Sequence, residues 1–239
     1  IANVSAASFL SAMFAPDSIV ACFGVGLATS RATATVQPLP TTLAGTTVRV
    51  RDSAGTERLA QLFFAGPDQV NYLMPVGTAP GTATIIITNS NGELSVGTVL
   101  ITPVAPALFS ANANSAGAAA AVILRVKTNG QQVFEVASQF DATAKGFVPV
   151  PVSLGPQGEQ VFLVMFGTGV RGRSGPNAVS ATLGGTNLPV FSAGPQGDFA
   201  GLDQLNLGPV PRTLAGRGLV DLIVTVDGKV SNTVQFNIQ

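Results

Sequence analysis

The chain has 239 residues, of which 12 are basic and 12 acidic, so its formal net charge at pH 7 is zero. This balance argues against nucleic acid or an anionic membrane as partner, because both select basic patches. Only 10% of the residues are charged, against about 25% in an ordinary soluble domain, and the mean hydropathy is +0.43. No apolar run approaches the ~20 residues of a membrane helix, so we expect no membrane span.

Two residue counts restrict the chemistry. Histidine is absent, which excludes Ser-His-Asp and Cys-His catalysis and removes the commonest zinc ligand. Cys22 is the single cysteine, and its strand-like context SIVACFGVG predicts a buried, inert thiol without a disulfide. We therefore expect no enzymatic activity, no catalytic residue, no cofactor and no metal.

Aromatic composition bears on ligand binding. Tryptophan is absent and Tyr72 is the only tyrosine, which disfavours the exposed aromatic platforms that bind sugars. The fourteen phenylalanines mostly fall in strand patterns, and we expect them in the core.

Short β-branched and aromatic runs, punctuated by Gly, Pro, Asn and Asp, predict strands throughout and no long helix. In chain order the clearest runs are 46–51, 82–88, 161–167, 220–227 and 232–238. Tight hairpin turns are predicted at Asn91-Gly92, Asn129-Gly130 and Asp227-Gly228, because these pairs accept a positive φ.

Two segments are less regular. The alanine-rich SAGAAAAVILRV (115–126) favours a helix at its start, but its β-branched continuation and the hairpin signal that follows favour a strand. Pro149 and Pro151 suit an edge or connecting segment better than a central strand.

A heptapeptide occurs twice, as AGPDQVN (65–71) and AGLDQLN (200–206). Flanking segments also match: 18–27 with 161–170, and 81–95 with 218–231. The constant order of these parts indicates an internal duplication of a unit of about 85 residues, the size of one sandwich domain. We predict an all-β fold of two tandem immunoglobulin-like β-sandwich domains, residues 1–106 and 107–239.

The acids of the repeated phrase, Asp68 and Asp203, allow two interpretations. They could form a carboxylate pair for acid–base work, or each could set a turn by bonding the backbone two residues on. A duplicated unit repeats its folding devices more reliably than its catalysis, so we favour the structural role. Asp198 and Asp203 could bind calcium with loop carbonyls, but they lack the dense acidic spacing of a calcium loop, and this question stays open.

Three further features lie near the repeated phrase. The amides that follow each acid alternate and should therefore share one face of a strand; they are Gln69 with Asn71, and Gln204 with Asn206. The glycines of FGVG and FGTG indicate a bulge or strand exit rather than a phosphate loop. RGRSG (171–175) is expected to be a solvated turn, or to supply an Arg that pairs with a neighbouring subunit.

Long stretches also resemble a known family. The matching segments include APDSIVACFGVGLA (15–28), FAGPDQVNYLMP (64–75) and the whole of 193–238. These resemble the Solibacter C-terminal domain family, found in secreted proteins of soil acidobacteria, and each half resembles, more loosely, Ig-like IPT/TIG modules. The resemblance implies an exported, bacterial, Ig-like protein at the end of a larger polypeptide, and it implies no activity.

Two functions are consistent with these observations. The first is an extracellular structural protein that assembles with copies of itself into a filament or surface layer. In such an assembly, the N-terminal segment IANVSAASF would add as a strand to a sheet edge, either of its own chain or of a neighbouring copy. The second is an adhesion or anchoring module that binds a protein or glycan. For either function, it stays open whether Ile1 follows a removed signal peptide or upstream domains.

Overall fold

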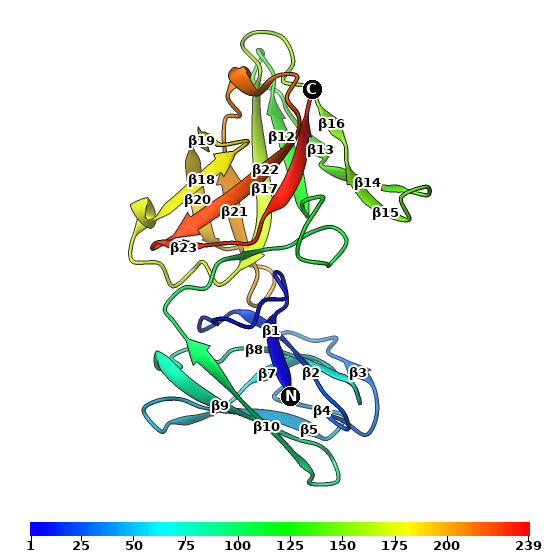
Figure 1. The fold of residues 1–239 in the computed structure, drawn as a ribbon, viewed down its shortest axis with the longest axis vertical. Coiled ribbons are helices and arrows are strands. Elements are labelled where there is room, and N and C mark those ends of the chain that lie inside the picture. Colours follow the sequence, from blue (N-terminus) through cyan, green and yellow to red (C-terminus); the bar gives the residue numbers. More distant parts are fainter. The chain divides into compact units, whose positions relative to one another are not determined.

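The computed structural model describes all 239 residues, which form strands and two short 3-10 helices (Figure 1). The chain divides into two compact units. Unit 1 comprises residues 1–105 together with 197–202, and unit 2 comprises residues 106–196 and 203–239. The main division thus falls next to residue 106, but the short segment 197–202 groups with unit 1. No helix has both the length and the apolar character that crossing a membrane requires.

Unit 1 contains two sheets. Sheet A has the order β1-β2-β8-β7-β3, and sheet B has the order β10-β9-β5-β4, with β6 paired to β5. The strands of sheet A are β1 (Ala2–Ser5), β2 (Ile19–Phe23), β8 (Gln69–Leu73), β7 (Gln61–Ala65) and β3 (Ala32–Thr33). Those of sheet B are β10 (Leu94–Ile101), β9 (Gly81–Thr88), β5 (Thr46–Arg51), β4 (Thr42–Leu43) and β6 (Glu57–Leu59).

The two sheets of unit 1 share one core. Alternate residues of β5 and β9 are buried, as the period of two in a strand requires, and they join buried residues of β2 and β8 in a single apolar cluster. Tyr72 is the largest of these side chains, and its hydroxyl lies 3.1 Å from Oδ1 of Asn3, to which it donates a hydrogen bond. The unit is therefore a β-sandwich.

Unit 2 is built in the same way. Sheet C has the order β13-β12-β17-β21-β20, with β11 paired to β17, and sheet D has the order β16-β24-β22-β18-β19, with β23 paired to β22. The strands of sheet C are β13 (Gln132–Val136), β12 (Ala121–Val126), β17 (Gln160–Thr168), β21 (Asp203–Leu207), β20 (Val190–Pro195) and β11 (Ala107–Leu108). Those of sheet D are β16 (Pro151–Val152), β24 (Val234–Ile238), β22 (Gly218–Val226), β18 (Val179–Leu183), β19 (Thr186–Leu188) and β23 (Lys229–Val230).

Four smaller elements complete unit 2, two strands and two 3-10 helices. The strands β14 (Ser138–Asp141) and β15 (Gly146–Pro149) form a separate hairpin that projects from the sandwich (Figure 1). The 3-10 helices η1 and η2 cover Pro176–Ala178 and Arg212–Leu214.

The two units repeat one topology. In the first sheet of each unit, β2, β8 and β7 correspond to β17, β21 and β20; in the second, β10, β9, β5 and β6 correspond to β24, β22, β18 and β19, and β4 has no counterpart. Even an irregularity is repeated: the register shifts between Leu62 and Phe64 in β7, and between Val190 and Ser192 in β20. The predicted all-β fold of two duplicated sandwiches is confirmed.

Several local predictions can be compared with the structure. Gly92, Gly130 and Gly228 have positive φ angles of 82°, 83° and 74° at the three predicted hairpin turns. The alanine-rich segment becomes a strand only from Ala121 onward, as β12. Pro149 ends the β14–β15 hairpin, and Pro151 begins the edge strand β16.

The N-terminal segment is not a free strand. Residues Ala2–Ser5 pair antiparallel with β2 at the edge of sheet A, so the segment adds to its own sheet. Of the two possibilities that the sequence left open, the structure shows the intramolecular one.

The expectation that phenylalanines lie mainly in the core is wrong. Phe14 and Phe236 are fully buried, whereas Phe134, Phe140, Phe191 and Phe199 are 63–71% exposed. Phe134 and Phe191 lie on the outer face of sheet C, and a sandwich buries only one face of each sheet. Phe140 lies on the separate β14–β15 hairpin, and Phe199 lies outside the strands.

Candidate functional site

The outer face of sheet C in unit 2 forms an open apolar groove with a volume of about 690 Å³. Its aromatic residues come from three strands: Phe134 from β13, Phe162 and Phe166 from β17, and Phe191 from β20. Valines and Leu124 fill the spaces between them, and no lining residue carries a charge. We call this surface the phenylalanine face.

The strand period explains how the face arises. In β17, Val161, Leu163 and Met165 point into the sandwich and are buried. The alternate residues therefore point outward, and they are Phe162, Val164 and Phe166 rather than polar residues. An antiparallel sheet with one solvated face usually alternates apolar with polar residues, so this face departs from the ordinary pattern.

A β-bulge positions the most exposed ring. The register of β20 against β21 skips Phe191, which lies between the paired residues Val190 and Ser192. Phe191 is 71% exposed, and its ring meets that of Phe162 edge-to-face, with 5.5 Å between the centroids and 85° between the planes. Bulges of this kind re-aim a side chain, and here the bulge holds a large ring above the groove.

A chain of amides borders the phenylalanine face. Gln204 Nε2 donates to Asn206 Oδ1 at 2.9 Å, and Asn206 Nδ2 donates to Ser192 Oγ at 2.9 Å. Unit 1 repeats the first of these bonds, because Gln69 Nε2 donates to Asn71 Oδ1 at 2.8 Å. The amides of each phrase thus share one face of their strand, as predicted from their alternation.

The two acids of the repeated phrase lie in different environments. Asp68 is 69% exposed at its side chain, and its carboxylate lies 3.1 Å from Nη2 of Arg31. Asp203 is fully buried; its carboxylate accepts hydrogen bonds from the Val170 amide at 2.7 Å and from Nε of Arg171 at 2.8 Å. Burial raises the pKa of Asp203, although these donors and the Arg171 charge act in the opposite direction.

This geometry supports a structural role for Asp203, but through bonds to Val170 and Arg171 rather than, as the sequence predicted, to the backbone two residues on. Its carboxylate ties the RGRSG turn to β21 and forms an ion pair with Arg171. A guanidinium and amide donors around a carboxylate oppose a cation there. No group of three or more acidic, cysteine or histidine side chains lies close enough together to hold a metal ion.

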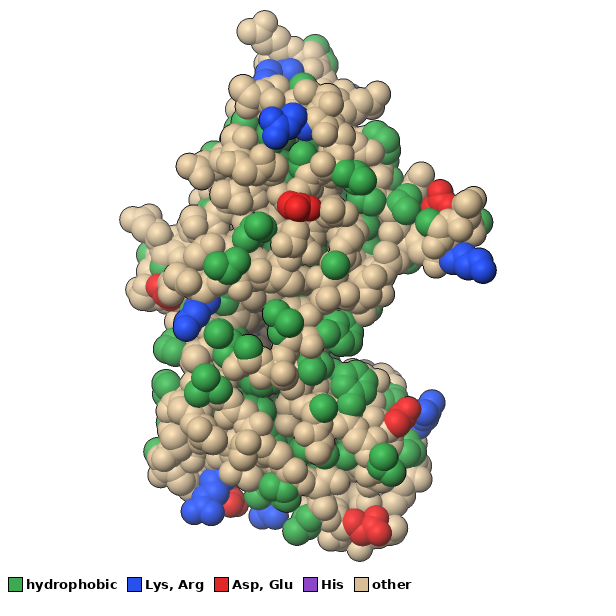
Figure 2. Space-filling model, viewed as in Figure 1, with side chains coloured by type: hydrophobic (Ala, Val, Ile, Leu, Met, Phe, Trp, Pro, Cys, Tyr) green, Lys and Arg blue, Asp and Glu red, His purple; other side chains and the backbone are tan.

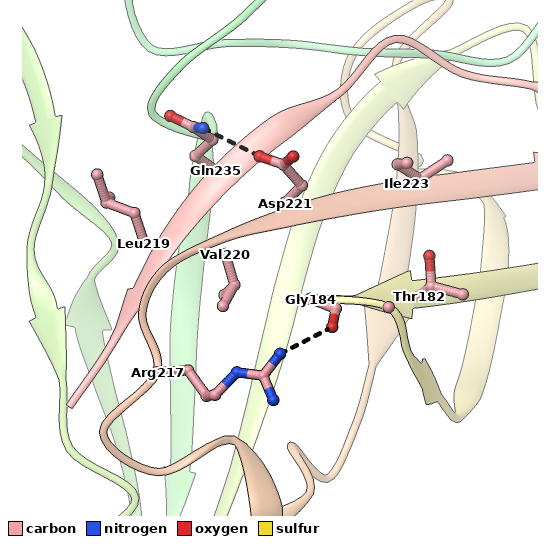
Figure 3. A pocket seen from close by; sticks show the side chains of 9 residues that line it. Thr182, Gly184, Arg217, Leu219, Val220, Asp221, Ile223 and Gln235 are labelled. Atoms are coloured by element: carbon pink, nitrogen blue, oxygen red, sulfur yellow. Dashed lines mark hydrogen bonds between the residues drawn. The ribbon is translucent and has the colours of Figure 1, made fainter.

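A second hollow, of about 590 Å³, lies on the outer face of sheet D. Asp221 accepts a hydrogen bond from Gln235 at 2.9 Å, and Nη2 of Arg217 lies 3.5 Å from the Gly184 carbonyl (Figure 3). Asp221 is the one acid that lines this hollow. Glycosidase chemistry needs two facing carboxyl groups, so the residues present do not form such a site.

Cys22 lies in the core of unit 1 and is fully buried. Desolvation raises the pKa of its thiol to about 11. Since the thiolate is the reactive form of cysteine, the arrangement opposes reactivity at neutral pH, as predicted.

The structure thus brings together residues that sequence reasoning did not. The phenylalanine face contradicts the expectation that the phenylalanines lie in the core, because the pattern of one strand does not show which strands lie beside it or which of its faces is covered. The signal was present in VFLVMF (161–166), where aromatic residues occupy the positions that alternate with the core residues.

Comparisons with known proteins give little further information. No protein-family model matches the chain, and no curated protein matches it. Among solved structures, the crystal structure of murine CEACAM1b is 12% identical, covers 95% of this chain and 96% of its own, and has a TM-score of 0.20. At that TM-score the likeness carries no argument about what this chain does.

Proposed function

We propose that this chain is a non-enzymatic extracellular structural protein whose copies assemble with one another into a filament or surface layer. The observation that carries the proposal is the phenylalanine face, an uncharged apolar surface on which Phe134 and Phe191 are 66% and 71% exposed. Contiguous apolar surface of this kind marks interaction sites in soluble proteins. The low overall charge and the resemblance to the Solibacter C-terminal domain family support export, and family membership is part of the proposal.

We propose that the face of one copy packs against the same face of another. Two apolar sheet faces pack about 10 Å apart with interdigitating side chains. Because no lining residue is charged, the contact leaves no ion desolvated and no like charges opposed. Charged side chains are also sparse and scattered on the surface seen in Figure 2.

The contribution of one ring can be estimated. A phenylalanine contributes about 150–250 Å² of apolar surface, and most of the Phe191 side chain is exposed in the isolated chain. At about 25 cal/mol per Å², covering it stabilises an interface by about 3 kcal/mol, or roughly 100-fold in the dissociation constant.

The experiment compares Phe191→Ser with a matched control, Phe140→Ser. Each substitution removes one ring of an exposed edge-to-face pair, Phe162–Phe191 on the face and Phe140–Phe147 on the hairpin. Light scattering after gel filtration and negative-stain electron microscopy should show weaker assembly for Phe191→Ser alone. A wild-type protein that stays monomeric at high concentration contradicts the proposal, as does equal assembly by all three proteins.

The amide chain favours a second candidate, an adhesion or anchoring module that binds a protein or glycan. Asn206 and Gln204 present directional polar groups beside an apolar groove, which is how ligand sites fix orientation. Glycan and peptide arrays probed with the wild type and with Asn206→Ala test this candidate. Asn71→Ala, at the equivalent position of unit 1, is the control. Array binding that is lost only in Asn206→Ala supports the adhesion module. If the wild type binds nothing on the arrays, this candidate is refuted.

A further inference from the structure

The edge strand of sheet B, β10, presents backbone groups that no other strand uses. Asn89 N–H bonds the Glu93 carbonyl, which places the odd-numbered residues of this strand toward β9. At the other end, Phe14 N–H bonds the Leu100 carbonyl, and Thr102 N–H bonds the Phe14 carbonyl, so even-numbered residues point away from β9. The N–H and C=O groups of Leu94, Val96 and Thr98 therefore point outward, where sheet B has no further strand.

The side chains of this strand are open as well. Leu94, Val96 and Leu100 are 61%, 54% and 47% exposed. Phe14 occupies the edge at Leu100, so the backbone edge is unoccupied over Leu94–Thr98. The Ile1 side chain contacts this stretch at Gly97, but on the face of the strand where a side chain of Gly97 would lie.

The other sheet edges carry features that protect against strand addition, and β10 carries none. Natural edge strands are shortened, bulged or supplied with charge or proline. Here β1, β3, β4, β16 and β19 have two to four residues, β13 carries Glu135, and β20 has both a bulge and Pro195. In contrast, β10 has eight residues in regular register and the sequence LSVGTVLI, without charge or proline.

We propose that β10 of one copy pairs antiparallel with β10 of a second copy, related by a two-fold axis at Val96. This inference rests on the proposed self-assembly and names one contact of it. The register follows from the outward groups: Val96 faces Val96 of the second copy, and Leu94 faces its Thr98. Alternate pairs of an antiparallel ladder exchange two hydrogen bonds each, which gives about six in this contact.

A second copy is favoured over another strand because the edge is self-complementary. Under the two-fold axis, every outward donor meets an outward acceptor. Leu94 and Val96 extend the apolar surface across the junction, and the strand carries no charge that would oppose itself.

The test places a charge on the axis. Val96→Lys alone and Val96→Glu alone set like charges directly opposite each other, whereas an equimolar mixture sets opposite charges together. Sedimentation velocity should show a dissociation constant raised at least tenfold for each variant and recovered in the mixture. Leu59→Lys, on the exposed strand β6 of the same sheet, is the matched control and should behave like the wild type.

A second measurement does not depend on weakening the fold. Val96→Cys should form an oxidised dimer across the axis, whereas Leu59→Cys should not; the native Cys22 is buried in both. Val96→Lys and Val96→Glu that associate as the wild type does, or Val96→Cys that fails to cross-link, overturn the pairing. If assembly then still depends on Phe191, the proposed function stands and only the β10 contact is wrong.

Discussion

The repeated phrase offers a matched pair of substitutions, Asp203→Ala and Asp68→Ala. The same residue occupies equivalent positions of the two units, but Asp203 is fully buried and Asp68 is 69% exposed at its side chain. If Asp203 stabilises unit 2 through its buried contacts, Asp203→Ala should destabilise that unit. Asp68→Ala should have little effect on unit 1.

The magnitudes follow from the contacts. Asp203→Ala leaves the buried amide of Val170 without its acceptor, which costs about 1–3 kcal/mol, and takes the carboxylate from Arg171. Burial outweighs these interactions in setting the pKa of Asp203, so the ion pair itself adds little; we expect a net loss of about 3 kcal/mol because Arg171 and the Val170 amide lose this acceptor. The pair of Asp68 with Arg31 is exposed and screened by solvent, and its loss should cost less than about 0.5 kcal/mol.

Differential scanning calorimetry at pH 7 and urea denaturation measure both variants. We expect the transition of unit 2 to fall by about 10 °C in Asp203→Ala and that of unit 1 to move by about 1 °C in Asp68→Ala. If the two variants lose similar free energies of unfolding, or if Asp68→Ala loses more, the stabilising role assigned to Asp203 is refuted.

Three further predictions concern single sites in unit 1. The amide of Ala79 and the guanidinium of Arg58 help to hold the pKa of Asp52 at about 2, below the usual 3.8. The stability from Asp52 is therefore complete above about pH 4 and lost as pH falls through 2, and urea titrations should show a weaker pH dependence there for Asp52→Asn. The Thr46 hydroxyl is buried without a hydrogen-bond partner, so Thr46→Val should raise the free energy of unfolding by about 1 kcal/mol in urea titrations. Cys22, with its pKa raised to about 11, should react with a thiol reagent at pH 8 only in denaturant, and reaction in the native state would contradict its burial.

The fold was predictable because local signals and the duplication agree. Asn-Gly and Asp-Gly pairs fix the hairpins, and the two copies of the phrase place β8 and β21 at the same position of their sheets. The repeated register shift at Phe63 and Phe191 was not predictable, because no single residue type marks a bulge.

The candidate surface was predictable only in part. The shared face of Gln204 and Asn206 follows from strand alternation. The partnership of Phe134, Phe162 and Phe191 does not, because it depends on β13, β17 and β20 lying in one sheet with β12 and β21 between them. The free edge of β10 likewise depends on strand order, which hydrophobic periodicity alone does not encode.

Because the two units are duplicates, residues at equivalent positions can be compared to find which features both units share and which occur only in unit 2. Both units keep the amide pair of the phrase and the bulge in the neighbouring strand. On the strand beside the phrase, Phe162 and Val164 of β17 correspond to Ile19 and Ala21 of β2, which are smaller. Unit 1 keeps a phenylalanine at the positions of Phe166 and Phe191, namely Phe23 and Phe63, so on these strands the two surfaces differ at Phe162 and Val164 and not at every large side chain.

The two proposed self-contacts lie on different units, which has a consequence for the proposed assembly. A single two-fold contact closes a dimer, and a chain of subunits needs a second contact elsewhere on the molecule. If the phenylalanine face and β10 supply these two contacts, as we propose, assemblies of the wild type should grow with concentration, whereas Phe191→Ser and Val96→Lys should each stop at a dimer held by the remaining contact. The double variant should be a monomer in sedimentation equilibrium. A monomer from either single substitution would contradict this scheme, because it would mean that the two surfaces act as parts of one interface.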